Sequence, residues 1–293
     1  MKKSVFGYTL VELMIALVLG LIVIAAGIQL LIGGQKSLLF QSAVVDVQDN
    51  ANIGINYITS DIHHANLNMP NRAMVKNKIS GLVVSGENYI EPPVDGGSII
   101  KMDGAVFSES ATGPSFTDSK SDTLVIQYRP VMAKGYDCEG NIITSVNEII
   151  VQRYFLRVDK NSPNKDLALV CDAGKYSVNT GTKIIGLDGS GQIIMPRVDQ
   201  FKVLIGVING TQMAYMTPKQ FTDSPVGARA VSLQIGVLVR SVDNSGSNTQ
   251  ENNQFKLLNE TYKLAVPDTV NGKYLRIPVE QSIAFRNALG DAS

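Results

Sequence analysis

Histidine and cysteine are both scarce in this sequence, which narrows the chemistry open to it. The 293 residues include 2 His and 2 Cys. Cys138 and Cys171 lie far apart and belong to no CxxC pair, so zinc-ribbon and thioredoxin-type motifs are excluded. His63 and His64 are adjacent, and on a helix their side chains point about 100° apart, so they do not both face one metal ion. We therefore expect a solvated helix end there, with no metal site and no cofactor.

An excess of charge of either sign is also missing. The chain has 26 basic and 26 acidic residues, which gives a formal net charge of +0, and it contains no run of like charges. Nucleic-acid grooves and polybasic membrane patches both depend on clustered Lys and Arg, so the sequence does not indicate nucleic acid as a partner. We expect the partners to be proteins.

Motifs for catalysis are weak. Residues 98–101 (SIIK) have the SxxK spacing of penicillin-binding enzymes, but the companion Ser-Asp-Asn and Lys-Thr-Gly elements are missing. Residues 188–191 (DGSG) carry one carboxylate, too few for an EF-hand-like calcium site. No Walker loop and no GxGxxG follows a strand pattern. We expect no catalytic residue and no enzyme.

One long apolar run lies close to the N-terminus. Between Lys3 and Lys36 the only charged residue is Glu12. Residues 13–32 are almost wholly apolar, and as a helix these roughly 20 residues would span about 30 Å, the thickness of the hydrocarbon layer of a membrane. Because two lysines precede the run, residues 1–7 are expected to stay in the cytoplasm while the rest of the chain faces the other side.

A removable secretory signal peptide is one alternative interpretation of this run. Residues 25–27 are small and would suit cleavage behind an apolar segment. Two features favour a retained helix. Glu12 lies within the first turns, where an acid is costly in lipid and is therefore a functional candidate, and the apolar pattern continues through Ile32. A plain single-span anchor is the other alternative, and it leaves Glu12 without a role.

The helical pattern continues beyond the apolar run, with apolar residues on one face and Asp61 among the polar residues off that face. The apolar positions are Val44, Ala51, Ile55, Ile58, Ile62 and Ala65. Helix-stop residues follow from Asn66 to Pro70. A single helix over residues 8–66 would be on the order of 90 Å long. One half must then be buried by neighbours and the other half by the chain's own domain.

The residues at the start of the run form a specific pattern. A short basic leader precedes Gly7, an aromatic residue follows at Tyr8, and Glu12 is the fifth residue after the glycine. This pattern resembles the class III signal of type IV pilins and type II secretion pseudopilins, which a prepilin peptidase cleaves after the glycine and methylates at the new N-terminus. The resemblance implies that Gly7 and Tyr8 flank the cleavage site, that Tyr8 becomes N-methylated, and that Glu12 sets the register between subunits.

The role implied for Glu12 agrees with its chemistry. A carboxylate in lipid is tolerable when a cation pairs with it, and cleavage after Gly7 would create an α-amine that a neighbouring subunit can present. Two residues depart from the commonest family pattern. Tyr8 replaces Phe, and Gln29 stands where major pilins usually carry a proline that kinks the helix. The resemblance therefore leaves a kink near Gln29 open.

After Pro70 the pattern changes to short β-type runs separated by turn residues, which predicts a β-rich domain. Residues 188–191 suggest a hairpin turn between 184–185 and 193–194. Residues 69–121 are poorly patterned and predict long, partly mobile connections. We expect strands at 123–128, 148–158, 167–171, 201–207, 231–242, 262–266 and 274–285, the last interrupted near its proline, Pro278, and a polar loop at 241–253.

Several segments of this region are similar to PilW-type minor pilins, namely 121–126, 169–171, 198–203 and 228–233. Arg276 and residues 285–287 are similar to the closing strand that this family shares with J-type pseudopilins. The implied fold is α+β, with a long N-terminal transmembrane and amphipathic helix packed on an antiparallel β-sheet domain. The implied parts are 1–7 as prepilin leader, 8–33 as the transmembrane half of the helix, 34–66 as its amphipathic half, and 67–293 as a periplasmic β-rich domain.

The resemblance implies a minor pilin that helps to initiate and assemble a type IV pilus and lies at its tip. The implied partners are other minor pilins, the major pilin, the prepilin peptidase and the assembly platform of the inner membrane. The chain would cross the inner membrane once, with its C-terminal domain in the periplasm, and would later belong to a pilus at the cell surface. A type II secretion pseudopilin is the nearest alternative.

An alternative of another class is a secreted ligand-binding or hydrolytic domain behind an ordinary signal peptide. Its mature chain would start near Gln29. In either case a domain that leaves the cytoplasm favours a single disulfide between Cys138 and Cys171, worth about 3–4 kcal/mol in the chain-entropy model. Two buried free thiols are the alternative.

Overall fold

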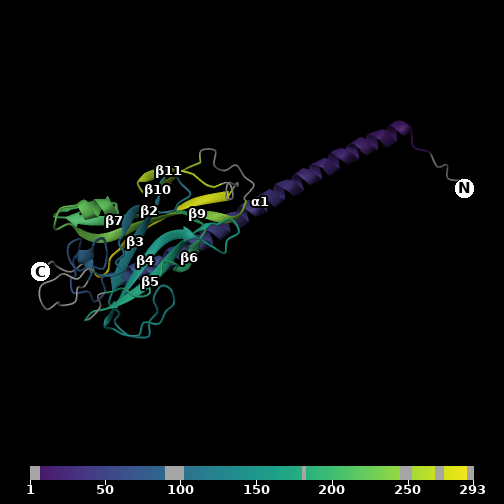
Figure 1. Ribbon diagram of the computed structural model, residues 1–293. Helices are drawn as coiled ribbons and strands as arrows, with labels where there is room; N and C mark the ends of the chain where they lie inside the picture. The colour runs from purple at the N-terminus through teal and green to yellow at the C-terminus, as the bar shows by residue number, and fades with distance from the viewer. Residues whose placement is uncertain (1–6, 90–101, 180–182, 245–252, 268–273, 289–293) are drawn as a thin grey trace.

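The computed structural model describes residues 7–89, 102–179, 183–244, 253–267 and 274–288. Residues 1–6 of the expected leader and the SIIK sequence at 98–101 lie outside this part of the chain, as do eight residues of the expected polar loop, 245–252. A long helix extends from a β-rich domain (Figure 1). The α+β fold expected from the sequence is confirmed.

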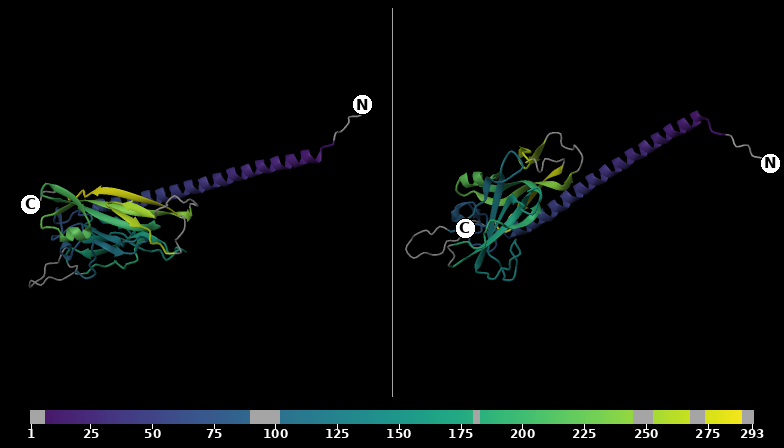
Figure 2. Two further views of the ribbon diagram at one scale, coloured as in Figure 1. Left: turned by 90° about the horizontal axis from the view of Figure 1, so that it is seen from above. Right: turned by 45° about the vertical axis from the view of Figure 1, so that its right-hand side comes forward.

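Helix α1 covers Leu10–His64, 55 residues without interruption. It begins two residues later than predicted because Thr9 has extended backbone angles and caps the helix, its Oγ1 accepting the amide N–H of Glu12 at 3.3 Å. The helix is continuous through Gln29, the position where a kink was left open. Both views in Figure 2 show it leaving the domain as a single rod.

One face of the second half of α1 packs on the domain. The expected apolar stripe is confirmed, because Ala51, Ile55, Ile58, Ile62 and Ala65 are buried and Val44 is partly buried. Three further buried positions, Ala43, Val47 and Gly54, complete the stripe. A Cβ at Gly54 would overlap the side chain of Met195, so the glycine permits close approach of a strand.

Two five-stranded antiparallel sheets form the domain. The first has the order β2-β3-β4-β5-β6, and the second has the order β1-β9-β7-β8 with β12 also paired to β9. The strands of the first sheet are β2 Glu109–Gly113, β3 Ser121–Tyr128, β4 Glu148–Val158, β5 Leu167–Ser177 and β6 Gln192–Pro196. The other elements are β1 Met74–Val75, η1 Gly86–Asn88, β7 Val198–Asn209, β8 Gln212–Met216, α2 Pro218–Asp223, β9 Arg229–Asn244, β10 Gln254–Leu257, β11 Glu260–Lys263 and β12 Tyr274–Ala284.

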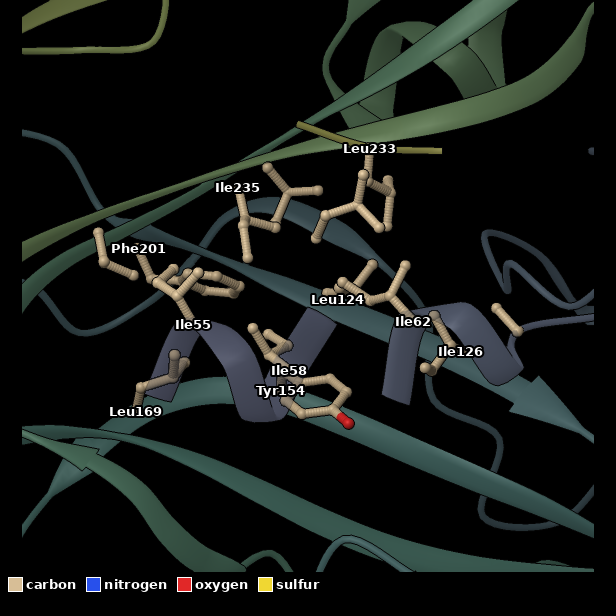
Figure 3. Packing of buried hydrophobic residues seen from close by; sticks show 14 of the residues in the cluster. Ile55, Ile58, Ile62, Leu124, Ile126, Tyr154, Leu169, Phe201, Leu233 and Ile235 are labelled. Carbon is tan, nitrogen blue, oxygen red and sulfur yellow. The ribbon is translucent and has the colours of Figure 1, made fainter. Parts of the chain in front are cut away.

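Helix α1 lies between the two sheets. It contacts β9 and β12 of one sheet and β3 and β6 of the other. Figure 3 shows Ile58 of the helix between Ile235 on one side and Tyr154 on the other. Ile58 and Ile62 are fully buried. The core therefore consists of the two sheets, which also contact each other through β3 and β7, and the buried face of the helix.

Each predicted strand has a counterpart: β4 has the predicted bounds, four others are longer, and β12 ends one residue earlier. The strand expected at 262–266 is present only as β11, which ends at Lys263, and β9 continues to Asn244, into the loop expected at 241–253. Two further details were wrong. Strand β12 runs through Pro278 without interruption, because among the described strands it pairs with β9 alone and the proline is exposed at its free edge. The hairpin around 188–191 does not form, since Ile185 bridges Lys175 of β5 and β6 pairs with β5 too.

Buried ion pairs join strands across the fold. Asp122 of β3 accepts from Lys202 Nζ at 2.8 Å and from the amide of Val203 at 3.0 Å, both on β7, which ties the two sheets together. Asp199 of β7 pairs with Arg240 of β9 at 3.2 Å and with Arg276 of β12 at 2.7 Å. These charges are paired and hydrogen-bonded, as burial requires.

The poorly patterned stretch 69–121 holds only short elements among its described residues. Side-chain amides hold its residues 75–88 in place. Asn88 Oδ1 accepts from the amides of Val84 and Ser85 at 2.8 and 2.9 Å, and its Nδ2 donates to three carbonyls, the shortest being Lys78 O at 2.8 Å. Gln127 Nε2 of β3 donates to the carbonyl of Asn88 at 2.7 Å. These bonds replace the ladder that a longer strand would supply.

Asp61, which the sequence places among the polar residues off the apolar stripe, is partly buried against the domain. Asp61 Oδ2 accepts from the hydroxyl of Tyr154 at 2.7 Å. Burial raises the pKa of Asp61 to about 6; the Tyr154 hydrogen bond opposes this shift and the charge of Asp137 adds to it. Because the folded pKa is raised, protonation of Asp61 stabilises the fold at low pH, and this contribution is lost as the pH rises to about 6.

Replacing Asp61 by Asn should therefore stabilise the domain above pH 7. The full shift corresponds to roughly 3 kcal/mol, which partial exposure reduces to about 1–2 kcal/mol. Thermal unfolding of the detergent-solubilised chain, followed by circular dichroism, should show a higher Tm for Asp61→Asn at pH 8 and no difference near pH 4. Asp49→Asn, exposed on the same helix, is the control. A Tm difference independent of pH would contradict the assignment.

Candidate processing and assembly site

The segment before α1 is exposed and not helical. Gly7 and Tyr8 precede the helix, and Tyr8 is 84% exposed. A Cβ on Gly7 would meet no described atom within 4 Å, and its φ does not lie in the left-handed region. The fold of the single chain therefore does not require glycine at this position. An accessible peptide bond outside regular secondary structure, after a small residue, is what a protease can bind.

Glu12 lies in the first turn of α1. Its side chain is exposed, and its amide donates to the Thr9 cap. An acid at this end of a helix gains about 0.3–1 kcal/mol from the macrodipole. An acid next to an apolar run is also costly in lipid, and the cost rises toward the centre of the membrane. An acid at this place is therefore a functional candidate.

The first half of α1 is not covered by any part of the chain that the structure describes. All large apolar side chains from Leu10 to Ile32 are at least 45% exposed. The helix is long and apolar enough to cross a membrane. Such a surface requires lipid or other apolar helices around it.

Apolar side chains also lie on the outer face of the second half of α1. Leu38, Val45 and Ile53 are 67%, 53% and 69% exposed and lie on the side opposite the buried stripe. Their spacing of seven and eight residues keeps them on one helix face. The helix therefore offers an apolar surface that continues beyond the membrane half.

The end of α1 is fixed by two asparagines. Asn287 Nδ2 donates to the carbonyls of His63 and Ala65, both at 3.0 Å, and Asn66 Nδ2 donates to the carbonyl of Asn287 at 3.1 Å. Asn66 has a φ of 65°, the left-handed conformation that ends helices. His64 is exposed and lies 5.5 Å from the Tyr128 ring, whereas His63 is half-buried. The solvated helix end thus holds for one histidine of the two.

Cys138 and Cys171 are joined in a disulfide, with 6.1 Å between their Cα atoms. Cys171 lies on β5, and Cys138 lies in the connection between β3 and β4. Tyr57 of α1 donates its hydroxyl proton to the carbonyl of Cys138 at 2.9 Å. The disulfide and this hydrogen bond hold the connection against both the helix and the sheet. Among the described residues, no three His, Cys, Asp or Glu side chains are grouped as metal ligands.

Two family models match the chain. Type IV Pilus-assembly protein W matches residues 153–287, and the Prokaryotic N-terminal methylation motif matches residues 2–28. No curated protein matches. Among solved structures, a type IV-like pilin from Thermus thermophilus is similar with 12% identity and a TM-score of 0.36, over 82% of this chain and 97% of that one.

The two family matches lie at opposite ends of the chain and agree with each other. The methylation motif covers Gly7, Tyr8, Glu12 and the helix up to Ile28, and the second match covers most of the domain. Together they indicate a structural protein that assembles with other pilins, is processed by a prepilin peptidase, and is anchored in a membrane with its C-terminal domain outside. The two matches support the assignment of this chain to the PilW-type minor pilins.

Proposed function

We propose that this minor pilin primes the assembly of a type IV pilus and stays at the pilus tip. The observation that carries the proposal is the geometry of α1. Its first half is uncovered and apolar, with one acid in the first turn, while its second half is fixed in the domain. The priming and tip roles follow from the resemblance to the PilW-type family, whose members are low-abundance subunits.

In this proposal, the prepilin peptidase cuts after Gly7 at the cytoplasmic face of the inner membrane. The exposure of residues 7–9 supports access to this bond. Tyr8 then becomes the N-terminal residue and is methylated there. Residues 8–33 form the transmembrane half of the helix, and the domain lies in the periplasm until the assembly platform moves the subunit into the filament.

Glu12 then sets the register between subunits. In lipid its carboxylate needs a cation, and the α-amine of Tyr8 on a neighbouring subunit is available after cleavage. The apolar face of the same helix packs on neighbouring helices as the subunit leaves the membrane. Leu38, Val45 and Ile53 extend this packing beyond the membrane half, since they point away from the domain. The other minor pilins and the major pilin supply the neighbours.

Replacing Gly7 by Leu should prevent cleavage, because the peptidase signal requires a small residue there. The precursor should stay in the membrane with its first seven residues, which mass spectrometry of the purified chain will detect. Gly27→Leu is the matched control, since an added side chain there also meets no described atom within 4 Å. Its N-terminus should be Tyr8. A Tyr8 N-terminus in the Gly7→Leu variant would refute the cleavage site, and one near Gln29 would indicate an ordinary signal peptide.

Replacing Glu12 by Gln should leave cleavage and membrane insertion intact but impair assembly. Losing one charge-assisted contact worth about 1.4 kcal/mol lowers an equilibrium tenfold, so we expect at least tenfold fewer pili per cell by electron microscopy. Glu109→Gln, which makes the same change at an exposed acid on β2 of the domain, should assemble normally. Normal pilus numbers in Glu12→Gln would remove the register role. Normal pili combined with a loss of type II secretion would instead identify a pseudopilin.

A subunit that primes assembly should be found at one end of the filament. Gold-labelled antibody against the domain should mark a single end of sheared pili, at about one site per filament. A label distributed along the whole filament would contradict the tip position while leaving the pilin role intact. Antibody against the major pilin, which should decorate the full length, is the control.

A further inference from the structure

An open groove lies where α1 ends, at the end of the domain opposite the departing helix. Its volume is about 810 Å³. The lining comes from 66–69 after α1, 129–131 after β3 and 286–287 after β12, together with Arg72 and Val146. Segments far apart in the sequence thus meet at this end of the domain.

The charge of the groove is positive. Arg72, Arg129 and Arg286 line it, and no carboxylate lies among its described lining residues. Within the described part of the chain, none of these three arginines forms an ion pair. Arg129 is oriented by bonds to Val146 O at 2.8 Å and Asn147 Oδ1 at 2.9 Å, whereas Arg72 and Arg286 are exposed. Three cations without an acid favour an anionic ligand.

Apolar side chains stand beside these cations. Leu67, Met69 and Val131 are part of the lining, and Val131 is 64% exposed. The neighbouring Met132 is 70% exposed. The described lining has no aromatic ring on which a nucleic-acid base could stack. A surface that combines arginines with exposed aliphatic side chains suits a peptide that carries both acids and apolar residues.

The groove is held in shape before any ligand binds. The hydrogen bonds among Asn66, Asn287 and the end of α1 fix one wall. The Cys138–Cys171 disulfide holds the β3–β4 connection that forms the other wall. A wall that is already ordered loses less conformational entropy on binding.

We propose that this groove binds an acidic, partly apolar segment of a second pilin-like subunit. The proposal rests on the pilin function, because it names the contact by which the domain selects a neighbour. The membrane half of α1 leaves from the opposite end of the domain (Figure 2). The bound segment therefore belongs to the subunit that lies farther from the membrane.

A fluorescein-labelled peptide with the sequence Asp-Leu-Glu-Asp-Leu-Glu tests the ligand class. The full chain in detergent micelles should bind this peptide, and an Asn-Leu-Gln-Asn-Leu-Gln analogue should bind at least tenfold more weakly in fluorescence anisotropy. A higher salt concentration should weaken the binding of the acidic peptide but not that of the analogue. Equal binding of the two peptides would overturn the proposal.

The double variant Arg72→Glu/Arg286→Glu tests the location. Both side chains are exposed, so the substitutions leave the core intact, and the affinity for the acidic peptide should fall at least tenfold. Lys160→Glu is the matched control, because it also replaces an exposed basic residue by an acid. Lys160 follows the end of β4, whereas the groove lies beside the start of this strand. The control variant should bind like the unaltered chain, and an unchanged Tm will verify the folding of each variant.

Three other outcomes would also overturn the assignment. Unchanged affinity in the double variant would place the peptide elsewhere. Tighter binding of an oligothymidylate of equal charge would indicate nucleic acid as the ligand. Asp291 is an acid near the end of the sequence, in a part that the structure does not describe. If the peptide binds only to the Asp291→Asn variant, the chain's own last residues are the ligand of the groove. Cleavage after Gly7 and the need for Glu12 are measured independently, so these failures would leave the pilin function untouched.

Discussion

Burial of one face of α1 between two sheets is the contact on which the rest of the structure depends. Ile58 and Ile62 are fully buried there, with side chains of both sheets around them. This packing fixes the second half of the helix in the domain and leaves the first half outside it. An exposed apolar helix of that length is stable only in lipid or among other helices. The same contact therefore produces the fold and the requirement for a membrane or a filament.

Much of this arrangement can be predicted from the sequence, because it depends on local periodicity. The 3.6-residue repeat of α1 and the strand at 148–158 are visible in the order of the residues alone. The errors have a different origin. Pro278 does not interrupt β12 because that strand lies at a sheet edge, and Ile185 pairs with β5 rather than with a hairpin partner. Both depend on which strands become neighbours, and periodicity does not contain that information.

The candidate site divides along the same line. Gly7, Tyr8 and Glu12 lie within six residues and form a pattern that is visible in the sequence. The structure adds that no described atom would clash with a side chain at Gly7. The groove could not be found that way. Two of its three arginines, Arg72 and Arg286, stand near opposite ends of the domain sequence and come together because β1 and β12 both pair with β9 and Asn287 binds the end of α1. A charge-balanced chain thus holds a local excess of positive charge that its composition hides.

The match to the PilW family acquires a physical meaning from these contacts. Residues 153–287 include β6, β9 and β12, which all contact α1, and end at Asn287, which donates hydrogen bonds to the last carbonyls of the helix. They also include Asp199 and the two arginines that bind it, which join β7 to β9 and β12. Buried ion pairs contribute little net stability, but a buried charge without its partner is costly. The pairs therefore favour the one strand register in which every partner is in place. What the family model matches is therefore largely the surface that holds the helix.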